Sequence, residues 1–181
     1  MKIIDNYVSE FESTRIREVL TSNTFPWNYC DKVVTTQDND RHQFTHVFYF
    51  EGEPQSRYYH DLLLREFLTN LDACALIKVK ANLQTKTESV IKNTMHTDHT
   101  FPHAYTGIYY VNDNNGYTFF EDGTCVDSVA NRMVIFPSHL KHSGTTCTDS
   151  PYRSVINVNF FPSKEQWVSN SSPPILFAAK K

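Results

Sequence analysis

Two side chains that can bind a metal stand two residues apart in the segment MHTDHT. If the segment is extended, residues at i and i+2 project from the same face, so His96 and Asp98 lie side by side. A neutral imidazole nitrogen and a carboxylate oxygen can take two adjacent positions on a metal ion. Downstream, FPSHLKHSGTT supplies His142 and SPYRSVINVNF supplies Arg153. Two histidines and one carboxylate on one face of a metal leave its other face open for substrates.

The same region leaves other ligand sets open. A His-x-Asp pair alone is weak, because a chain with 8 histidines contains one easily by chance. His99 and His103 could form a surface cluster with His96 in the loop before the next strand. His139 competes with His142, since residues three apart on an extended segment cannot both point inward. The spacing to the downstream arginine favours His142, which leaves His139 as a turn residue.

The segment that carries Arg153 predicts a strand with two different faces. Along it, one face carries Ile156, Val158 and Phe160, and the other carries Arg153, Val155, Asn157 and Asn159. A half-solvated strand also places polar residues on one face. If helices cover the outer face, however, the apolar set turns toward them and the arginine points into the barrel. A buried cation is costly unless it is paired, so an anionic ligand would be its natural partner.

Arg132 is the alternative anchor for an anion. It begins a predicted strand after a polar turn, where a solvated arginine is the usual case. Arg153 is therefore the better candidate.

Composition limits the class of protein. A chain of 181 residues has the length of a single domain and can close one sizeable core. The hydrophobic share of 40%, with 13 Phe and 10 Tyr, favours a β-rich globular protein. The formal charge of −3 gives no basic footprint, so nucleic acid is not an expected partner. No feature of the sequence indicates an oligomeric state.

The cysteines and the N-terminus point to a reducing compartment. Cys30, Cys74, Cys125 and Cys147 are scattered without a Cys-x-x-Cys pair, which argues against a structural zinc site or a disulfide scaffold. They are expected to fill the core. The N-terminus lacks a signal-peptide core, and no apolar run approaches membrane-spanning length. We therefore expect a cytoplasmic protein with no membrane partner.

The N-terminal part predicts helices. A short opening strand near Ile3 and Ile4 is followed by Ser9 and Glu12, the two positions of a capping box. The helix that they open should run for about three turns, and Asn23 and Pro26 end it. Its expected apolar stripe consists of Phe11, Ile16, Val19 and Leu20. The spacing of apolar residues predicts a second helix over 56–70, after a strand over 45–50.

The remainder predicts short strands separated by turns. They cover 75–83, 89–98, 104–112, 117–123, 124–130, 132–137 and 151–161. An Asp-Asn-Asn-Gly turn follows the third, and Asp122-Gly123 joins a hairpin. Helices followed by many short strands predict a mainly β fold, with the helices packed on one sheet of a closed or two-sheet antiparallel barrel.

We expect one domain over 1–181. It would consist of an N-terminal helical support region (1–72), a barrel core (73–162) and a C-terminal tail (163–181). The loops 35–41, 85–89 and 99–105 are the candidate lid elements, since they should border the metal end of the barrel.

Four segments together carry a resemblance to a known family. MHTD, GIYYVN followed by YTFFEDG, MVIFPSHLKHSG and YRSVINVNF resemble the Fe(II)- and 2-oxoglutarate-dependent dioxygenase superfamily, and within it the prolyl-hydroxylase-like branch. The resemblance covers 75–161. It implies a double-stranded β-helix (jelly roll), with Fe(II) held by His96, Asp98 and His142. It also implies that Arg153 binds the distal carboxylate of 2-oxoglutarate.

The resemblance assigns two further residues to the co-substrate. Tyr110, the second tyrosine of IYYVN, matches a position that often hydrogen-bonds the same carboxylate. Some branches place a serine two residues after the arginine, but this chain has Val155 there, which favours the Tyr110 arrangement. Asn82 is a weaker candidate to face the co-substrate. Tyr109 is expected to pack in the core.

The implied reaction is hydroxylation of an unactivated C–H bond with O2 and 2-oxoglutarate, releasing succinate and CO2. Ascorbate is a candidate reductant. The substrate would be a peptide or a small molecule, with a prolyl or other amino-acid substrate first. The alternatives are a cupin-like metal enzyme without 2-oxoglutarate and a non-catalytic jelly-roll binding module. A cupin would more often show His-x-His with a following glutamate, which this chain lacks.

Overall fold

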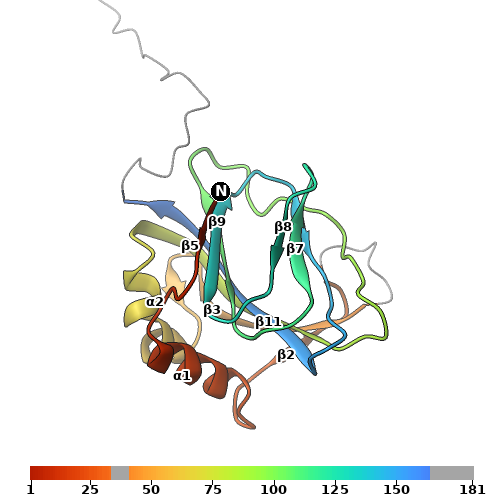
Figure 1. Ribbon diagram of the computed structural model, residues 1–181. Coiled ribbons are helices and arrows are strands. Elements are labelled where there is room, and N and C mark those ends of the chain that lie inside the picture. Colours follow the sequence, from red (N-terminus) through yellow and green to blue (C-terminus); the bar gives the residue numbers. More distant parts are fainter. Residues whose placement is uncertain (34–40, 164–181) are drawn as a thin grey trace, which may run out of the picture.

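The computed structural model describes residues 1–33 and 41–163, which form two antiparallel β-sheets and a few helical segments (Figure 1). The elements are β1 (Lys2–Ile4), α1 (Glu10–Leu20), β2 (Asn28–Cys30), β3 (Gln43–Phe50), β4 (Glu53–Pro54), η1 (Tyr59–Leu63), α2 (Glu66–Thr69), β5 (Ala73–Thr85), β6 (Tyr105–Tyr110), β7 (Tyr117–Phe120), β8 (Cys125–Asp127), β9 (Arg132–Pro137), β10 (His142–Gly144) and β11 (Tyr152–Pro162). The predicted mainly β character is confirmed.

The two sheets differ in size and face each other. The large sheet has the strand order β1-β9-β6-β11-β5-β3-β2, with β4 added beside β3, and the small sheet has the order β10-β7-β8. In Figure 1 the small sheet stands opposite the large one. A small apolar cluster lies between them, made of Ile108, Tyr110, Phe120, Val126, Val134, Phe136 and Val155. This arrangement is a double-stranded β-helix, as predicted.

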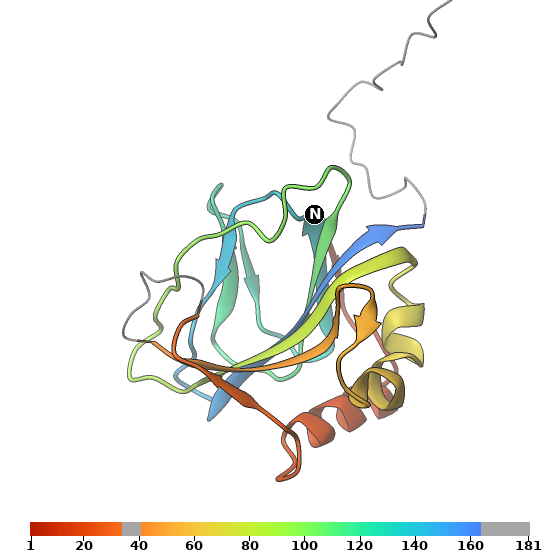
Figure 2. The same cartoon turned by 180° about the vertical axis from the view of Figure 1, so that it is seen from behind.

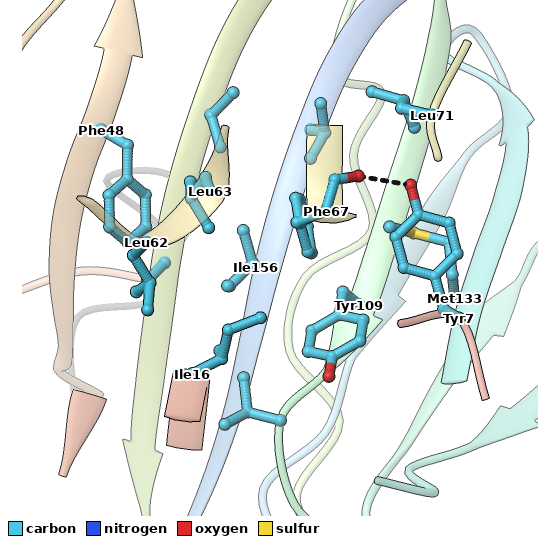
Figure 3. Packing of buried hydrophobic residues seen from close by; sticks show 14 of the residues in the cluster. Tyr7, Ile16, Phe48, Leu62, Leu63, Phe67, Leu71, Tyr109, Met133 and Ile156 are labelled. Atoms are coloured by element: carbon cyan, nitrogen blue, oxygen red, sulfur yellow. Dashed lines mark hydrogen bonds between the residues drawn. The ribbon is translucent and has the colours of Figure 1, made fainter. Parts of the chain in front are cut away.

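The helical segments cover the outer face of the large sheet (Figures 1 and 2). Ile156, Val158 and Phe160 of β11 are fully buried there, in one cluster with Ile16 and Leu63 of the helical layer. Figure 3 shows Ile16, Leu63 and Phe67 over Ile156. Burial of these side chains removes apolar surface from water, which is the main force that holds the helices on the sheet. The predicted orientation of β11 is confirmed, so its other face points between the sheets.

The cap of the first helix combines Ser9, directly before the helix, with Glu66 of another helix. Ser9 is the N-cap, and its Oγ accepts a hydrogen bond from the Glu12 N–H at 3.3 Å. The reciprocal acceptor is Glu66, whose carboxylate accepts from the Ser9 N–H at 2.6 Å and from its Oγ at 2.8 Å. Glu12 is buried and instead pairs with Arg15 at 2.6 Å and with Arg65 at 3.3 Å. The cap therefore joins α1 to α2.

Several local expectations were wrong. Phe11 is 69% exposed and does not belong to the buried stripe of α1. The helix predicted over 56–70 divides into η1 and α2, because Arg65 adopts φ −70° and ψ −103°, outside the helical region. Of the four cysteines, which are all free, Cys74 and Cys125 are exposed and only Cys147 is buried. The spacing of hydrophobic residues predicts neither a local break in a helix nor the exposure of a single side chain.

Strand predictions differ from the structure in both directions. Among the described residues, 89–98 forms no regular strand, although Lys92 and His96 make isolated bridges to Thr145 and His142. Three short strands were not predicted, namely β2, β4 and β10. The region predicted as helical support also supplies β1, β2, β3 and β4 to the large sheet.

Some expectations concern residues outside the described ranges. The lid loop 35–41 lies there apart from Arg41, and the C-terminal tail 163–181 lies there apart from Ser163. The division of the chain into 1–72, 73–162 and 163–181 stays a prediction. Within the described ranges, every helix is too short or too polar to cross a membrane.

Two neighbouring leucines test the contact between helices and sheet. Leu63 is fully buried, whereas Leu64 is 43% exposed. We expect Leu63→Ala to lower the free energy of unfolding by about 2–5 kcal/mol, because it leaves a cavity under η1. The control Leu64→Ala should change it by less than about 1 kcal/mol. Urea denaturation followed by circular dichroism measures both, and equal losses would contradict this packing.

Candidate metal centre

Three potential metal ligands converge at one end of the space between the sheets. The donor atoms of His96, Asp98 and His142 all lie within 4.8 Å of one another. His96 Nε2 is 3.5 Å from Asp98 Oδ1, and His142 Nε2 is 4.0 Å from Asp98 Oδ2. His142 is buried, and the other two side chains are partly buried. Within the described ranges, this is the one cluster of histidine, cysteine and acidic residues with metal-binding spacing.

Backbone hydrogen bonds explain why residues 46 positions apart meet. The His96 N–H donates to the His142 carbonyl, and the His142 N–H donates to the His96 carbonyl, both at 3.0 Å. Two opposed residues that exchange both bonds project their side chains from the same face. The Asp98 N–H donates to the Ser138 carbonyl at 3.2 Å, which fixes the third residue of the group. Thus 89–98 positions its ligands without forming a continuous strand.

The His142 ring is oriented for metal binding through Nε2. His142 Nδ1 is 3.0 Å from the Leu140 carbonyl, so this nitrogen carries the proton and donates. The lone pair of Nε2 then points toward Asp98. Burial lowers the pKa of His142, and the Asp98 charge only partly offsets this effect. A neutral imidazole is the form that ligates a metal.

Asp98 is held by a second layer of polar groups. Its Oδ2 accepts from Thr106 Oγ1 at 2.7 Å and from Asn159 Nδ2 at 2.9 Å. Thr106 Oγ1 also lies 3.0 Å from Ser138 Oγ. Burial alone would raise the pKa of Asp98, but the contacts with His96, Thr106 and Asn159 and the neighbouring His142 hold it below its usual range. The carboxylate is therefore ionised and fixed in direction, as a metal ligand requires.

A cavity of about 80 Å³ leads from the histidines toward Arg153. Its walls come from both sheets and include His96, His142 and Arg153. Asn82 and Asn157 also line it, and the Oδ1 atom of each is buried without a hydrogen-bond partner in the described structure. An unpaired buried acceptor costs about 1–3 kcal/mol. Buried oxygen acceptors without a partner in the wall of a cavity call for a hydrogen-bond donor there, which a bound ligand can supply.

Arg153 lies at the far end of this cavity and is 6% exposed. Its Nε donates to Ser128 Oγ at 2.9 Å, and its Nη2 donates to Thr118 Oγ1 at 3.2 Å. No carboxylate among the described residues pairs with it, and burial lowers the pKa of its guanidinium group. A Cβ at Gly144 would lie 3.0 Å from Arg153 Nη1, so the absence of a side chain there makes room for the guanidinium.

Asn82 lines the cavity, whereas Tyr110 lies behind its wall. The Tyr110 hydroxyl donates to Thr118 Oγ1 at 2.8 Å, and the Arg153 guanidinium carbon lies 5.7 Å from its ring centroid. Tyr110 is fully buried and does not line the cavity, whereas Thr118 does. A direct bond from Tyr110 to a bound carboxylate stays a prediction. Asn82 lines the cavity, and its contact with a co-substrate likewise stays a prediction.

The competing candidates lie elsewhere. His139 and His103 are exposed, and His99 stacks on Phe101 with 5.4 Å between ring centroids. Arg132 donates to the carboxylate of Asp5 from Nε at 2.6 Å and from Nη2 at 3.1 Å. None of the four lines the cavity.

The sequence did not predict roles for Thr106, Ser138, Thr118 and Ser128. Thr106 carried a signal, since it is a polar residue on the inward face of an otherwise apolar strand.

The donor set fits a divalent metal ion. Two imidazoles, one preset as an Nε2 donor, and a fixed carboxylate can take three positions on one face of the ion. A metal ion held by these three side chains would keep its other coordination positions free for a ligand in the cavity.

Comparison with solved structures supports this interpretation of the fold. A prolyl-4-hydroxylase from Pseudomonas putida superposes with a TM-score of 0.59 at 13% identity, over 89% of this chain and 91% of that one. A prolyl hydroxylase from Trichoplax adhaerens, in complex with a peptide fragment of the hypoxia inducible factor oxygen degradation domain, gives 0.57 at 13% identity, over 94% and 87%.

A third structure extends the comparison to another kind of bound molecule. HygX from Streptomyces hygroscopicus, with nickel, 2-oxoglutarate and hygromycin B bound, gives a TM-score of 0.56 at 12% identity, over 89% of this chain and 81% of that one. No family model and no curated protein matches the sequence. The chain thus has the fold of the 2-oxoglutarate–Fe(II) oxygenases, prolyl hydroxylases among them, and the resemblance in its sequence is confirmed at the level of the fold.

Two histidines three residues apart test the metal centre. His142→Ala removes a buried donor, so we expect the affinity for Mn(II) to fall by at least about 100-fold, because even outer-layer changes cost about 10- to 100-fold. The exposed His139→Ala is the matched control and should bind Mn(II) like the wild type. Isothermal titration calorimetry measures both. Loss of Mn(II) binding in the His139 variant alone would make His139 the metal ligand in place of His142.

Proposed function

We propose, since the chain has the fold of the 2-oxoglutarate–Fe(II) oxygenases, that it is an enzyme of this kind. It would hydroxylate an unactivated C–H bond of a prolyl or other amino-acid substrate and release succinate and CO2. One observation carries the proposal: a two-histidine, one-carboxylate group opens onto a cavity whose other end holds a buried arginine without a carboxylate partner in the described structure.

The three ligand residues would hold Fe(II) at the histidine end of the cavity. When bound, the iron and 2-oxoglutarate supply the oxidation with O2 that no side chain can perform. The role of the protein is to fix the orientation of the ligand side chains. The contacts from Thr106 and Asn159 hold the Asp98 carboxylate, and the Leu140 carbonyl holds the His142 ring.

Arg153 would bind the far carboxylate of 2-oxoglutarate. Thr118, which accepts from the Arg153 guanidinium, pairs with Gly144, and Phe120 pairs with His142 in the β10–β7 ladder. The strand position beside the guanidinium is therefore one two-residue step from that of His142. Such a step measures about 7 Å, comparable with the length of a five-carbon dicarboxylate. Thr118 and Ser128 fix the guanidinium plane, and a bidentate pair with a carboxylate would then orient the co-substrate as well as bind it.

The surroundings of the cavity favour a water-poor reaction space. Ile108, Val155 and the other apolar side chains between the sheets lie beside the polar groups. A low local dielectric strengthens the pairing of Arg153 with an anion.

The substrate class is inferred from the sequence segments together with the comparison enzymes. Two of the three comparison enzymes bind a peptide fragment and hygromycin B, respectively, so this fold accommodates a peptide in one protein and a small molecule in another. The prolyl-hydroxylase-like sequence segments favour an amino-acid substrate for this chain. A need for ascorbate and a cytoplasmic location stay predictions.

A direct test separates this function from the alternatives. We expect Mn(II) together with 2-oxoglutarate, or with its isostere N-oxalylglycine, to raise the melting temperature of the protein more than Mn(II) alone. A cupin-like enzyme would respond to the metal without 2-oxoglutarate, and a non-catalytic binding module would respond to neither. With Fe(II) and O2, the protein should then form succinate from 2-oxoglutarate.

Two arginines test the anion anchor. Arg153→Gln removes the buried cation, so we expect 2-oxoglutarate to bind on the order of 10- to 100-fold more weakly, the loss typical of a charge-assisted hydrogen bond. Mn(II) binding should persist, because the ligand residues are untouched. Arg132→Gln breaks only the pair with Asp5 and serves as the control. Calorimetry on the Mn(II)-loaded proteins measures both, and equal affinities would contradict the assignment.

A further inference from the structure

The cavity contains a second cation that the proposed function does not use. Lys80 lies on β5, paired with Asn157 of β11 on one side and with Val47 of β3 on the other. Its side chain lines the same cavity as Arg153 and the two histidine ligands. Asn82, two residues along β5 on the same face, and Asn157 across the ladder also line the cavity and flank it.

Lys80 is partly buried and lines the cavity without an ion-pair partner in the described structure. No carboxylate among residues 1–33 and 41–163 forms a salt bridge with it. Burial lowers the pKa of Lys80, the neighbouring Lys78 lowers it further, and Asp98 partly offsets both. Lys80 lines the same cavity as His96 and His142, so its ammonium shares this space with the candidate metal ligands. A partly buried cation without an ion-pair partner favours an anion beside it.

The charges of the proposed complex leave Lys80 uncompensated. The two positive charges of Fe(II) and the one of Arg153 are balanced by Asp98 and by the two carboxylates of 2-oxoglutarate. One carboxylate of 2-oxoglutarate would lie at the metal and the other at Arg153. Neither is then available to Lys80, whose charge calls for a further anionic group in the cavity.

We propose, on the basis of the function proposed above, that Lys80 binds a carboxylate of the primary substrate. Asn82 and Asn157 supply amide groups on either side, which can hydrogen-bond the same carboxylate or a neighbouring polar group. The substrate is then a small acid, such as a free amino acid with its own carboxylate. The backbone of an interior peptide residue has no carboxylate, so a peptide would meet Lys80 only through an acidic side chain or its C-terminus.

The chain contains a matched control for this assignment. Lys78 lies two residues before Lys80 on the same strand but does not line the cavity. Its ammonium lies 5.3 Å from the centroid of the Phe50 ring. Substitution of either lysine by methionine keeps an unbranched side chain and removes one charge from β5.

The test uses protein loaded with Mn(II) and 2-oxoglutarate without O2, titrated with L-amino acids, proline first, and with their primary amides. We expect calorimetry to show at least one acid binding to the wild type about tenfold or more tighter than its amide, the discrimination of a charge-assisted hydrogen bond. Lys80→Met should lose this preference, Lys80→Arg should restore much of it, and Lys78→Met should keep it.

Three results would overturn the inference. The first is that no acid binds, or that amides bind as well as acids. The second is that Lys80→Met retains the preference. The third is that Lys80→Met weakens 2-oxoglutarate itself by about tenfold or more, which would assign the Lys80 charge to the co-substrate. A wild type that binds Mn(II) but not 2-oxoglutarate would instead refute the proposed function, on which the inference rests.

Discussion

The pair of backbone hydrogen bonds between His96 and His142 is the constraint on which the candidate metal centre depends. It joins an irregular segment to the first residue of β10, and it places two imidazoles on the same side of the chain. Side-chain contacts then refine what the backbone fixes: the Leu140 carbonyl orients one ring, and Thr106 with Asn159 orients the carboxylate. The rigidity of the centre therefore comes from main-chain geometry, and the ligands need not be on one regular element.

The division of β11 into two faces connects stability with chemistry. Its apolar residues anchor the helical layer, and the opposite side carries the polar residues that meet the cavity. Because side chains alternate strictly along a strand, a register shift of one residue would exchange the two sets. Burial of the apolar face against α1 and η1 thus also determines that Arg153 points inward, where solvation is poor and a carboxylate is its best partner.

Much of this architecture could be predicted from the sequence, because period-two alternation in β11 and helical spacing in α1 report burial directly. The convergence of His96, Asp98 and His142 could be predicted, because His96 and Asp98 stand two residues apart and the spacing to Arg153 favours His142. The break at Arg65, the exposure of Phe11 and the replacement of Glu12 by Glu66 at the helix cap could not. Each depends on contacts between residues far apart in the chain, as do the partners of Asp98 and the separation of Tyr110 from the cavity by Thr118.

The position of β1 has a consequence for behaviour in solution. This strand of three residues pairs with β9, which would otherwise be the last strand of the large sheet. An uncovered outer strand offers free N–H and C=O groups to other molecules and can template aggregation. A short strand with a basic residue at its start, Lys2, is a poor template by comparison. The short β1 therefore makes this edge of the large sheet a poorer template for self-association than an uncovered β9 would be.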